Sequence, residues 1–162
     1  MFEWVPLILV IHVLGAIIWV GGNISLAIAV WGIRRSFPNQ PETVSRVISE
    51  VGRAFAWVMW PALVATLATG LANLSWYTPP AENWTGIPGA EWIVTSFAVA
   101  ALMVISAGLH TFVVGPRIRV LRSRRTPSPQ LTTLVRFNHV LEALTLMTAI
   151  LIVIVMVILA SL

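Results

Sequence analysis

The chain lacks cysteine, lysine and aspartate, and it carries few charges of any kind. Only 10% of its 162 residues are charged, whereas about a quarter are charged in ordinary soluble domains. The absence of cysteine excludes disulfide scaffolds, thiolate catalysis, zinc–thiolate sites and iron–sulfur clusters. The absence of aspartate excludes a Ser–His–Asp triad. Ten arginines and six glutamates are too few to cover a soluble protein of this size, so the composition excludes a typical soluble enzyme and a disordered tail.

What the chain has instead is apolar sequence, which makes up 58% of it and gathers in long runs. A helix needs about 20 apolar residues to cross a bilayer. Because backbone groups in lipid must be hydrogen-bonded within their own element, each run is predicted to be a helix. The sequence therefore predicts an all-α, integral membrane four-helix bundle, a single transmembrane domain over residues 1–162 in contact with membrane lipid. The predicted spans are residues 5–33, 54–73, 92–114 and 137–160.

The arginines are distributed on one side only of this arrangement. All ten lie in the connecting segments 34–53 and 115–136, and none lies in the connection 74–91 or at either end of the chain. The positive-inside rule makes the arginine segments cytoplasmic loops, and it places the outer loop 74–91 and both termini on the periplasmic or extracellular side. We expect a multi-pass protein of the cytoplasmic (inner) cell membrane. The sequence pI of 11.4 then reflects orientation and anionic lipid headgroups, and no nucleic-acid partner is predicted.

A few polar residues lie within the predicted spans, where ionisable groups are rare and mark function by default. Helical periodicity places them on small or polar faces that turn inward in a bundle. By the helix rise, His110 and His139 are nearly level near the cytoplasmic side, and His12 lies roughly 15 Å above them. The faces are formed by His12, Gly15, Trp19 and Gly22 in the first span, by Met59, Ala62, Thr66, Thr69 and Asn73 in the second, by Ser96, Met103, Ser106 and His110 in the third, and by Asn138, Glu142, Thr145 and Ala149 in the fourth, with His139 at its edge.

Imidazole is the group on which a functional hypothesis rests. A neutral imidazole binds iron, copper or zinc through one nitrogen while the other nitrogen donates to a nearby acceptor. The level pair His110 and His139 is placed to hold a metal or a haem, with Asn138, Glu142 and serines such as Ser96 as acceptors. The glycines beside His12 allow either close helix approach or room for a flat ligand, and Trp19 either stacks on a porphyrin or packs. The alternative for each histidine is a packed side chain that bonds to a neighbouring helix.

Three stretches resemble a known family. His12 to Gly22 (HVLGAIIWVGG) is similar to the opening helix of the CopD-like membrane proteins (copper resistance D) and of the related HemJ-type protoporphyrinogen oxidases. Residues 60–70 (WPALVATLATG) resemble their second helix, and Arg136-Phe-Asn138-His139 is similar to an Arg-x-x-Asn-Glu pattern of the HemJ group. The resemblance implies a four-helix bundle that binds haem b with His12 as axial ligand. A Lys early in the third helix of the HemJ group is replaced here by Ser96, and the Glu after Asn by His139, which indicates a rearranged ligand set.

Three hypotheses about function follow. The main one is a membrane redox protein that binds one or two haems b through His12, His110 and His139, and that transfers electrons with a quinone or another electron partner or oxidises a porphyrinogen or small molecule. The alternative is a copper-binding or copper-transport protein without enzymatic activity, in which His12, Met103, His110 and His139 provide a series of copper ligands across the bilayer. A structural subunit without cofactor is the third. The glycine faces are also compatible with a homo-oligomer, and no internal repeat stands out.

Overall fold

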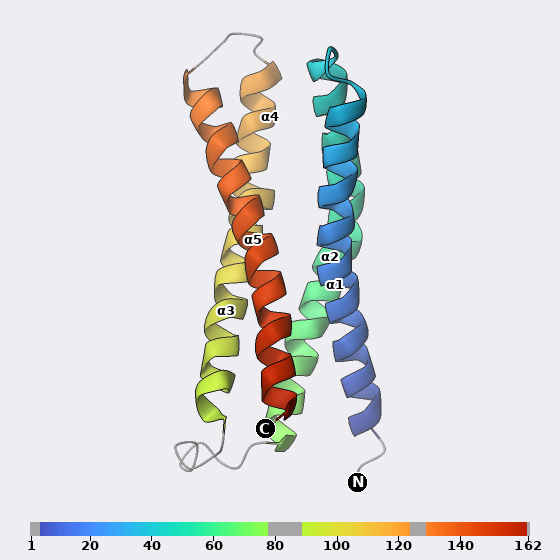
Figure 1. Cartoon of the computed structure of the whole chain (residues 1–162), viewed down its shortest axis with the longest axis vertical. Coiled ribbons are helices and arrows are strands. Elements are labelled where there is room, and N and C mark those ends of the chain that lie inside the picture. Colours follow the sequence, from blue (N-terminus) through green and yellow to red (C-terminus); the bar gives the residue numbers. More distant parts are fainter. Residues whose placement is uncertain (1–3, 78–88, 124–128, 162) are drawn as a thin grey trace. The chain divides into compact units, whose positions relative to one another are not determined.

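The computed structural model describes residues 4–77, 89–123 and 129–161. Within these ranges all regular secondary structure is helical, and no strand is present. Helix α3 continues through a π-helical turn, η2, into α4 without a break (Figure 1). The elements in chain order are α1 (Val5–Ser36), α2 (Pro41–Tyr77), α3 (Ala90–Gly108), η2 (Leu109–Val114), α4 (Gly115–Ser123) and α5 (Pro129–Ser161).

Four helical stretches are long and apolar enough to cross a membrane: Val5–Ser36, Pro41–Ser75, Ala90–Ser123 and Pro129–Leu159. Large apolar side chains are exposed on all four, which is unfavourable in water and expected for helices that contact lipid. Examples, one from each stretch, are Ile17, Val64, Phe112 and Val157. The prediction of an all-α, multi-pass membrane protein with four spanning helices is confirmed.

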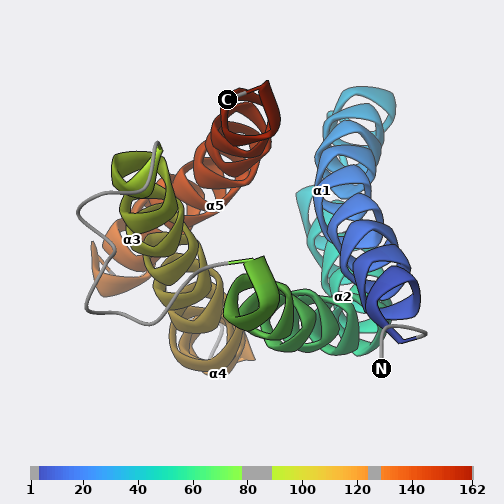
Figure 2. The ribbon, with the colours of Figure 1, turned by 90° about the horizontal axis from the view of Figure 1, so that it is seen from below.

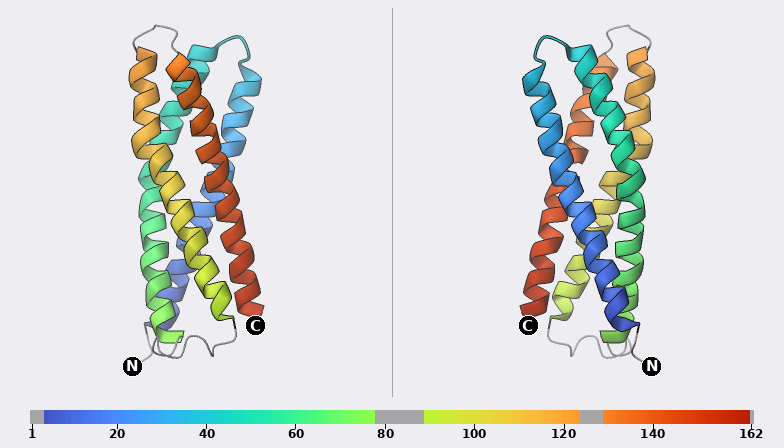
Figure 3. Two further views of the ribbon diagram at one scale, coloured as in Figure 1. Left: turned by 90° about the vertical axis from the view of Figure 1, so that its left-hand side faces the viewer. Right: turned by 90° about the vertical axis from the view of Figure 1, so that its right-hand side faces the viewer.

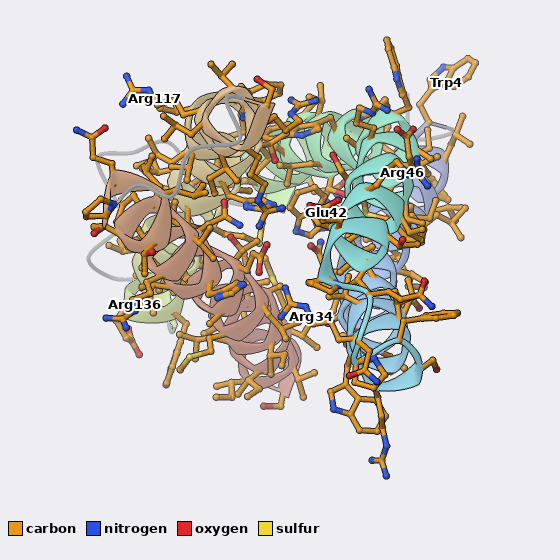
Figure 4. The ribbon with its side chains drawn as sticks, turned by 90° about the horizontal axis from the view of Figure 1, so that it is seen from above. Trp4, Arg34, Glu42, Arg46, Arg117 and Arg136 are labelled. Carbon is orange, nitrogen blue, oxygen red and sulfur yellow. The ribbon has the colours of Figure 1, made fainter. Side chains whose placement is uncertain are left out.

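The helices extend further than the predicted spans. Segments 34–53 and 115–136, expected as connections, are largely helical because α1 continues to Ser36, α2 begins at Pro41 and α5 begins at Pro129. Proline is tolerated in the first turn of a helix, where its missing N–H has no partner in any case. Most of the arginines therefore lie on helix ends rather than in loops, while Arg124 and Arg125 are outside the described residues. Figure 4 labels four of them, Arg34, Arg46, Arg117 and Arg136.

The chain divides into two compact units, Met1–Trp84 (unit 1) and Thr85–Leu162 (unit 2). In unit 1, α1 packs along α2. In unit 2, the continuous rod of α3, η2 and α4 packs along α5, as the end-on and side views show (Figures 2 and 3). Each unit is thus an antiparallel pair of long helices, and each is described by itself below.

Small residues allow the helices of unit 1 to approach closely. A Cβ at Gly15 would collide with Thr66 Oγ1 and lie 3.0 Å from the carbonyl oxygen of Ala62, and a Cβ at Gly22 would collide with the side chain of Met59. On the same face of α1, the buried Trp19 ring meets the ring of Trp60 edge-on, with centroids 6.1 Å apart. The glycines of the His12 face therefore serve close helix packing.

Unit 2 is held together by an apolar core with one polar contact in it. Val114, Ile118 and Leu141 form a buried cluster between the α3–α4 rod and α5. Nearer the middle of both helices, the buried Ser106 Oγ lies 3.0 Å from Thr145 Oγ1. Each hydroxyl has a single proton, and a carbonyl of its own helix, at Met103 for Ser106 and at Leu141 for Thr145, is within hydrogen-bond distance as a further acceptor. Their polar atoms are therefore satisfied within the pair.

Candidate metal-binding histidines

His12 lies on α1 and is anchored to α2 through one ring nitrogen. Its Nδ1 is 2.9 Å from the backbone carbonyl oxygen of Thr66. Because a carbonyl only accepts, Nδ1 carries the proton and donates it. The Thr69 hydroxyl oxygen lies 3.3 Å from the same nitrogen. In a neutral imidazole with a protonated Nδ1, the lone pair available to a metal is on Nε2.

The α2 backbone leaves just enough space for this ring. A Cβ at Gly70 would lie 3.0 Å from His12 Cε1 and 3.3 Å from Nδ1, closer than almost all real contacts of a Cβ. Gly70 therefore accommodates the imidazole while Thr66 and Thr69 orient it. One turn further along α2, the buried Oδ1 of Asn73 has no hydrogen-bond partner among the described residues. Over this stretch α2 therefore carries three polar side chains, those of Thr66, Thr69 and Asn73.

His110 lies in unit 2 and is anchored in the same manner, by a side chain instead of a carbonyl. Its Nδ1 is 2.9 Å from Asn138 Oδ1 on α5, and Asn138 Nδ2 donates in turn to Glu142 Oε1 at 2.8 Å. Glu142 Oε1 is 3.8 Å from His110 Nδ1, so the two groups form an ion pair whenever the imidazole is protonated. The His110 and Glu142 side chains are 35% and 45% exposed. With Nδ1 donating to Asn138, Nε2 again carries the lone pair.

The π-helical turn η2 positions His110. A π-helix bonds each N–H to a carbonyl five residues earlier, and such turns are frequent at functional sites. The Gly115 N–H reaches the His110 carbonyl in this way. The widened turn occurs just before Pro116, which has no N–H to continue an α-helical pattern. Sequence reasoning did not predict this turn, although a Gly-Pro pair within a helical run was the available signal.

The remaining predicted residues have more ordinary surroundings. Ser96 is buried on α3 and donates to the carbonyl of Ile93 in its own helix. His139 is exposed on α5, about 100° around the helix from Asn138. It is thus Asn138, rather than His139, that accepts the bond from the His110 ring. Thr66 and Thr69, which hold His12, were predicted only as members of a polar face.

Within residues 4–77, 89–123 and 129–161, no three or more His, Cys, Asp or Glu side chains lie close enough together to hold a metal ion. A closed structural metal centre normally has four such ligands. What the described residues offer is one oriented imidazole in each unit.

Comparison with known proteins identifies a related family. The family described as copper resistance protein D (CopD) matches residues 49–160, well over half of the chain. No curated protein and no solved structure matches the chain. The matched residues include His110, Asn138 and Glu142, whereas α1 with His12 precedes them. The match supports the copper alternative of the sequence analysis, and it gives no support to the HemJ assignment, to haem, or to oxidoreductase and electron-transfer activity.

Proposed function

The chain belongs to the copper resistance protein D family, and we propose that it is a membrane protein that binds copper ions as cargo through the imidazoles of His12 and His110. It has no enzymatic step in this proposal. Copper is bound through Nε2 of each ring, because Nδ1 is occupied by a hydrogen bond to the partner helix. The supporting observation is that both units orient an imidazole in the same way, at 2.9 Å in each case.

The chemistry of the donor is suited to copper. Imidazole is a common ligand of copper and binds it more strongly than it binds the other divalent first-row metals. Metal-ligating histidines almost always donate their second ring N–H to a carbonyl or another acceptor, which fixes the ring and raises the basicity of the ligand. The Thr66 carbonyl performs this role for His12, and the amide of Asn138, backed by the Glu142 carboxylate, performs it for His110.

The small number of ligands also favours transfer over storage. The chain has no cysteine, and thiolates are the donors that hold copper(I) most firmly. An ion held by few imidazoles, on helices that are long enough to cross the membrane, can be exchanged with a donor or an acceptor protein. This property is expected of a protein that handles copper as cargo.

The test is metal binding by the purified full chain in detergent. We expect copper, and no absorption band of haem, after expression with both copper and haem precursors supplied. The affinity for copper(I), measured by competition with a chromophoric chelator, should fall about tenfold or more in His12→Ala and in His110→Ala, since even ligand-orienting residues typically contribute 10–100-fold. Thr95→Val, on the exposed side of α3, is the control and should bind like the unmodified chain.

Two results would contradict the proposal. A stoichiometric haem spectrum with iron and without copper would favour the redox hypothesis. Copper binding that is unchanged in both histidine variants would show that these imidazoles only pack against the neighbouring helix.

A further inference from the structure

The two units share a pattern of contacts between their helices. In unit 1 the helices approach closely where Gly15 of α1 faces the hydroxyl of Thr66 on α2. In unit 2 the corresponding contact joins Ser106 of α3 to the hydroxyl of Thr145 on α5. A small residue thus meets a threonine at the same kind of position in both pairs. These contacts provide a register for comparing the units.

The second helix of each pair supports this register in detail. Residues 66–70 read Thr-Leu-Ala-Thr-Gly, and residues 145–149 read Thr-Leu-Met-Thr-Ala. Thr66 donates to the carbonyl four residues before it at 2.8 Å, and Thr145 does the same at 2.8 Å. The second threonines, Thr69 and Thr148, also donate four residues back, at 2.6 and 2.8 Å. Helices α2 and α5 are therefore equivalent over this stretch.

The first helices then align without further adjustment. Three residues before the close contact, His12 in unit 1 corresponds to Met103 in unit 2. Four residues after it, Trp19 corresponds to His110. Beyond this point the π-turn η2 adds one residue to unit 2, so that Gly22 corresponds to the buried Val114. Each unit therefore has two equivalent positions on its first helix, and the histidine occupies a different one in each.

We propose that Met103 is a ligand of copper(I), at the position in unit 2 that His12 holds in unit 1. This inference rests on the proposed function and deepens it, because a thioether donor selects the reduced ion. Met103 is only 4% exposed, and the residue at the place of Gly70 in this unit is the fully buried Ala149. A small residue thus occupies this position in both units, Gly70 beside His12 in unit 1 and Ala149 in unit 2. Leucine would fill a similar volume in the core at little cost, so the sulfur is the feature that distinguishes this position.

X-ray absorption at the copper edge tests the proposal on the full chain loaded with copper(I) in detergent. We expect a sulfur scatterer in addition to imidazole nitrogen in the unmodified chain. Met103→Leu should lose the sulfur signal and bind copper(I) about tenfold or more weakly, the lower bound for loss of groups that support a metal ligand. The control is Met147→Leu on α5, a methionine that is 68% exposed, and it should leave both measurements unchanged.

A second variant separates ligation from packing. Because Ala149 stands where Gly70 leaves space for the imidazole in unit 1, the variant combines Met103→His with Ala149→Gly; it should fold, restore binding with nitrogen in place of sulfur, and shift the preference from copper(I) towards copper(II). A purely structural methionine would give no such shift. Copper(I) binding without a sulfur scatterer in the unmodified chain, or unchanged affinity in Met103→Leu, would overturn the inference and leave the proposed function intact. A chain that binds no copper at all would overturn both.

Discussion

His12 on α1 donates its Nδ1–H to the backbone carbonyl of Thr66 on α2, at 2.9 Å. The two bonded residues are 54 positions apart in the sequence, so the bond joins two different helices. It fixes both the tautomer and the direction of the imidazole. A carbonyl cannot be removed by mutation, so the contact must be tested through the space that the ring occupies.

Gly70→Ala is the variant that does this. Its Cβ would lie 3.0 Å from His12 Cε1, and the ring must move away and weaken its bond to Thr66. We expect the copper(I) affinity to fall roughly 10–100-fold, as for other losses of ligand support, while the helix itself gains about 0.5–1 kcal/mol from the loss of a glycine. Gly52→Ala in the same helix, where nothing lies within 4 Å of the added Cβ, should leave binding unchanged. Equal affinities in the two variants would contradict the orienting role.

The second imidazole depends on a side chain that can be replaced. Asn138→Leu removes the acceptor of the His110 Nδ1–H, and we expect copper affinity to fall roughly 10–100-fold. Glu142→Gln keeps an oxygen for the Asn138 amide and should have the smaller effect. Chelator competition measures both, with Thr95→Val as control.

His139→Ala tests whether His110 acts with Asn138, as in the structure, or with His139, which the helix rise predicts to lie at the same depth. If its loss equals that of His110→Ala while Asn138→Leu is neutral, His139 is the partner.

The spanning helices could be predicted because their signal is local. The length of an apolar run is set by the thickness of the bilayer. The starts of α2 and α5 at Pro41 and Pro129 lie well before the predicted spans and were not predicted. The third predicted span even ends at Val114, where η2 meets α4. What these signals do not give is the length of helix outside the membrane, since the arginine-rich ends of α1 and α2 are helical without being apolar.

The site was harder to predict because it depends on rotation about the helix axis and on contacts between helices. The helix rise places His110 and His139 at one depth, but the rotation of α5 turns Asn138 toward His110. The acceptor for His12 is a backbone atom, which no residue type reveals. The correspondence inferred between the two helix pairs depends on where Gly15 and Ser106 meet their threonines. Such information appears only once the helices are packed.

Close packing at Gly15 gives a prediction about stability. Gly15→Ala would place a methyl group against Thr66 Oγ1, and overpacking of this kind typically costs about 1–3 kcal/mol. Gly21→Ala, with nothing within 4 Å, should be neutral or more stable by about 0.5–1 kcal/mol. Thermal unfolding in detergent, followed by circular dichroism, compares them. Adding Thr66→Ala should recover part of the loss in the Gly15 variant. A Gly15→Ala chain as stable as Gly21→Ala would mean that the helices do not approach there.

The orientation predicted from the arginines can be measured directly because the chain has no cysteine of its own. Ser36→Cys, Ser123→Cys and Ser161→Cys introduce single thiols at exposed positions, the first two within the arginine segments 34–53 and 115–136 and the third at the carboxyl end. By the positive-inside rule, a membrane-impermeant maleimide applied to the outer face of the cytoplasmic membrane in intact cells should label only the Ser161→Cys chain. The other two should react after the membrane is permeabilised, and the unmodified chain should remain unlabelled throughout. Labelling of Ser36→Cys or Ser123→Cys in intact cells would reverse the topology, and it would place the Asn138–Glu142 end of α5, with the His110 site, on the outer side.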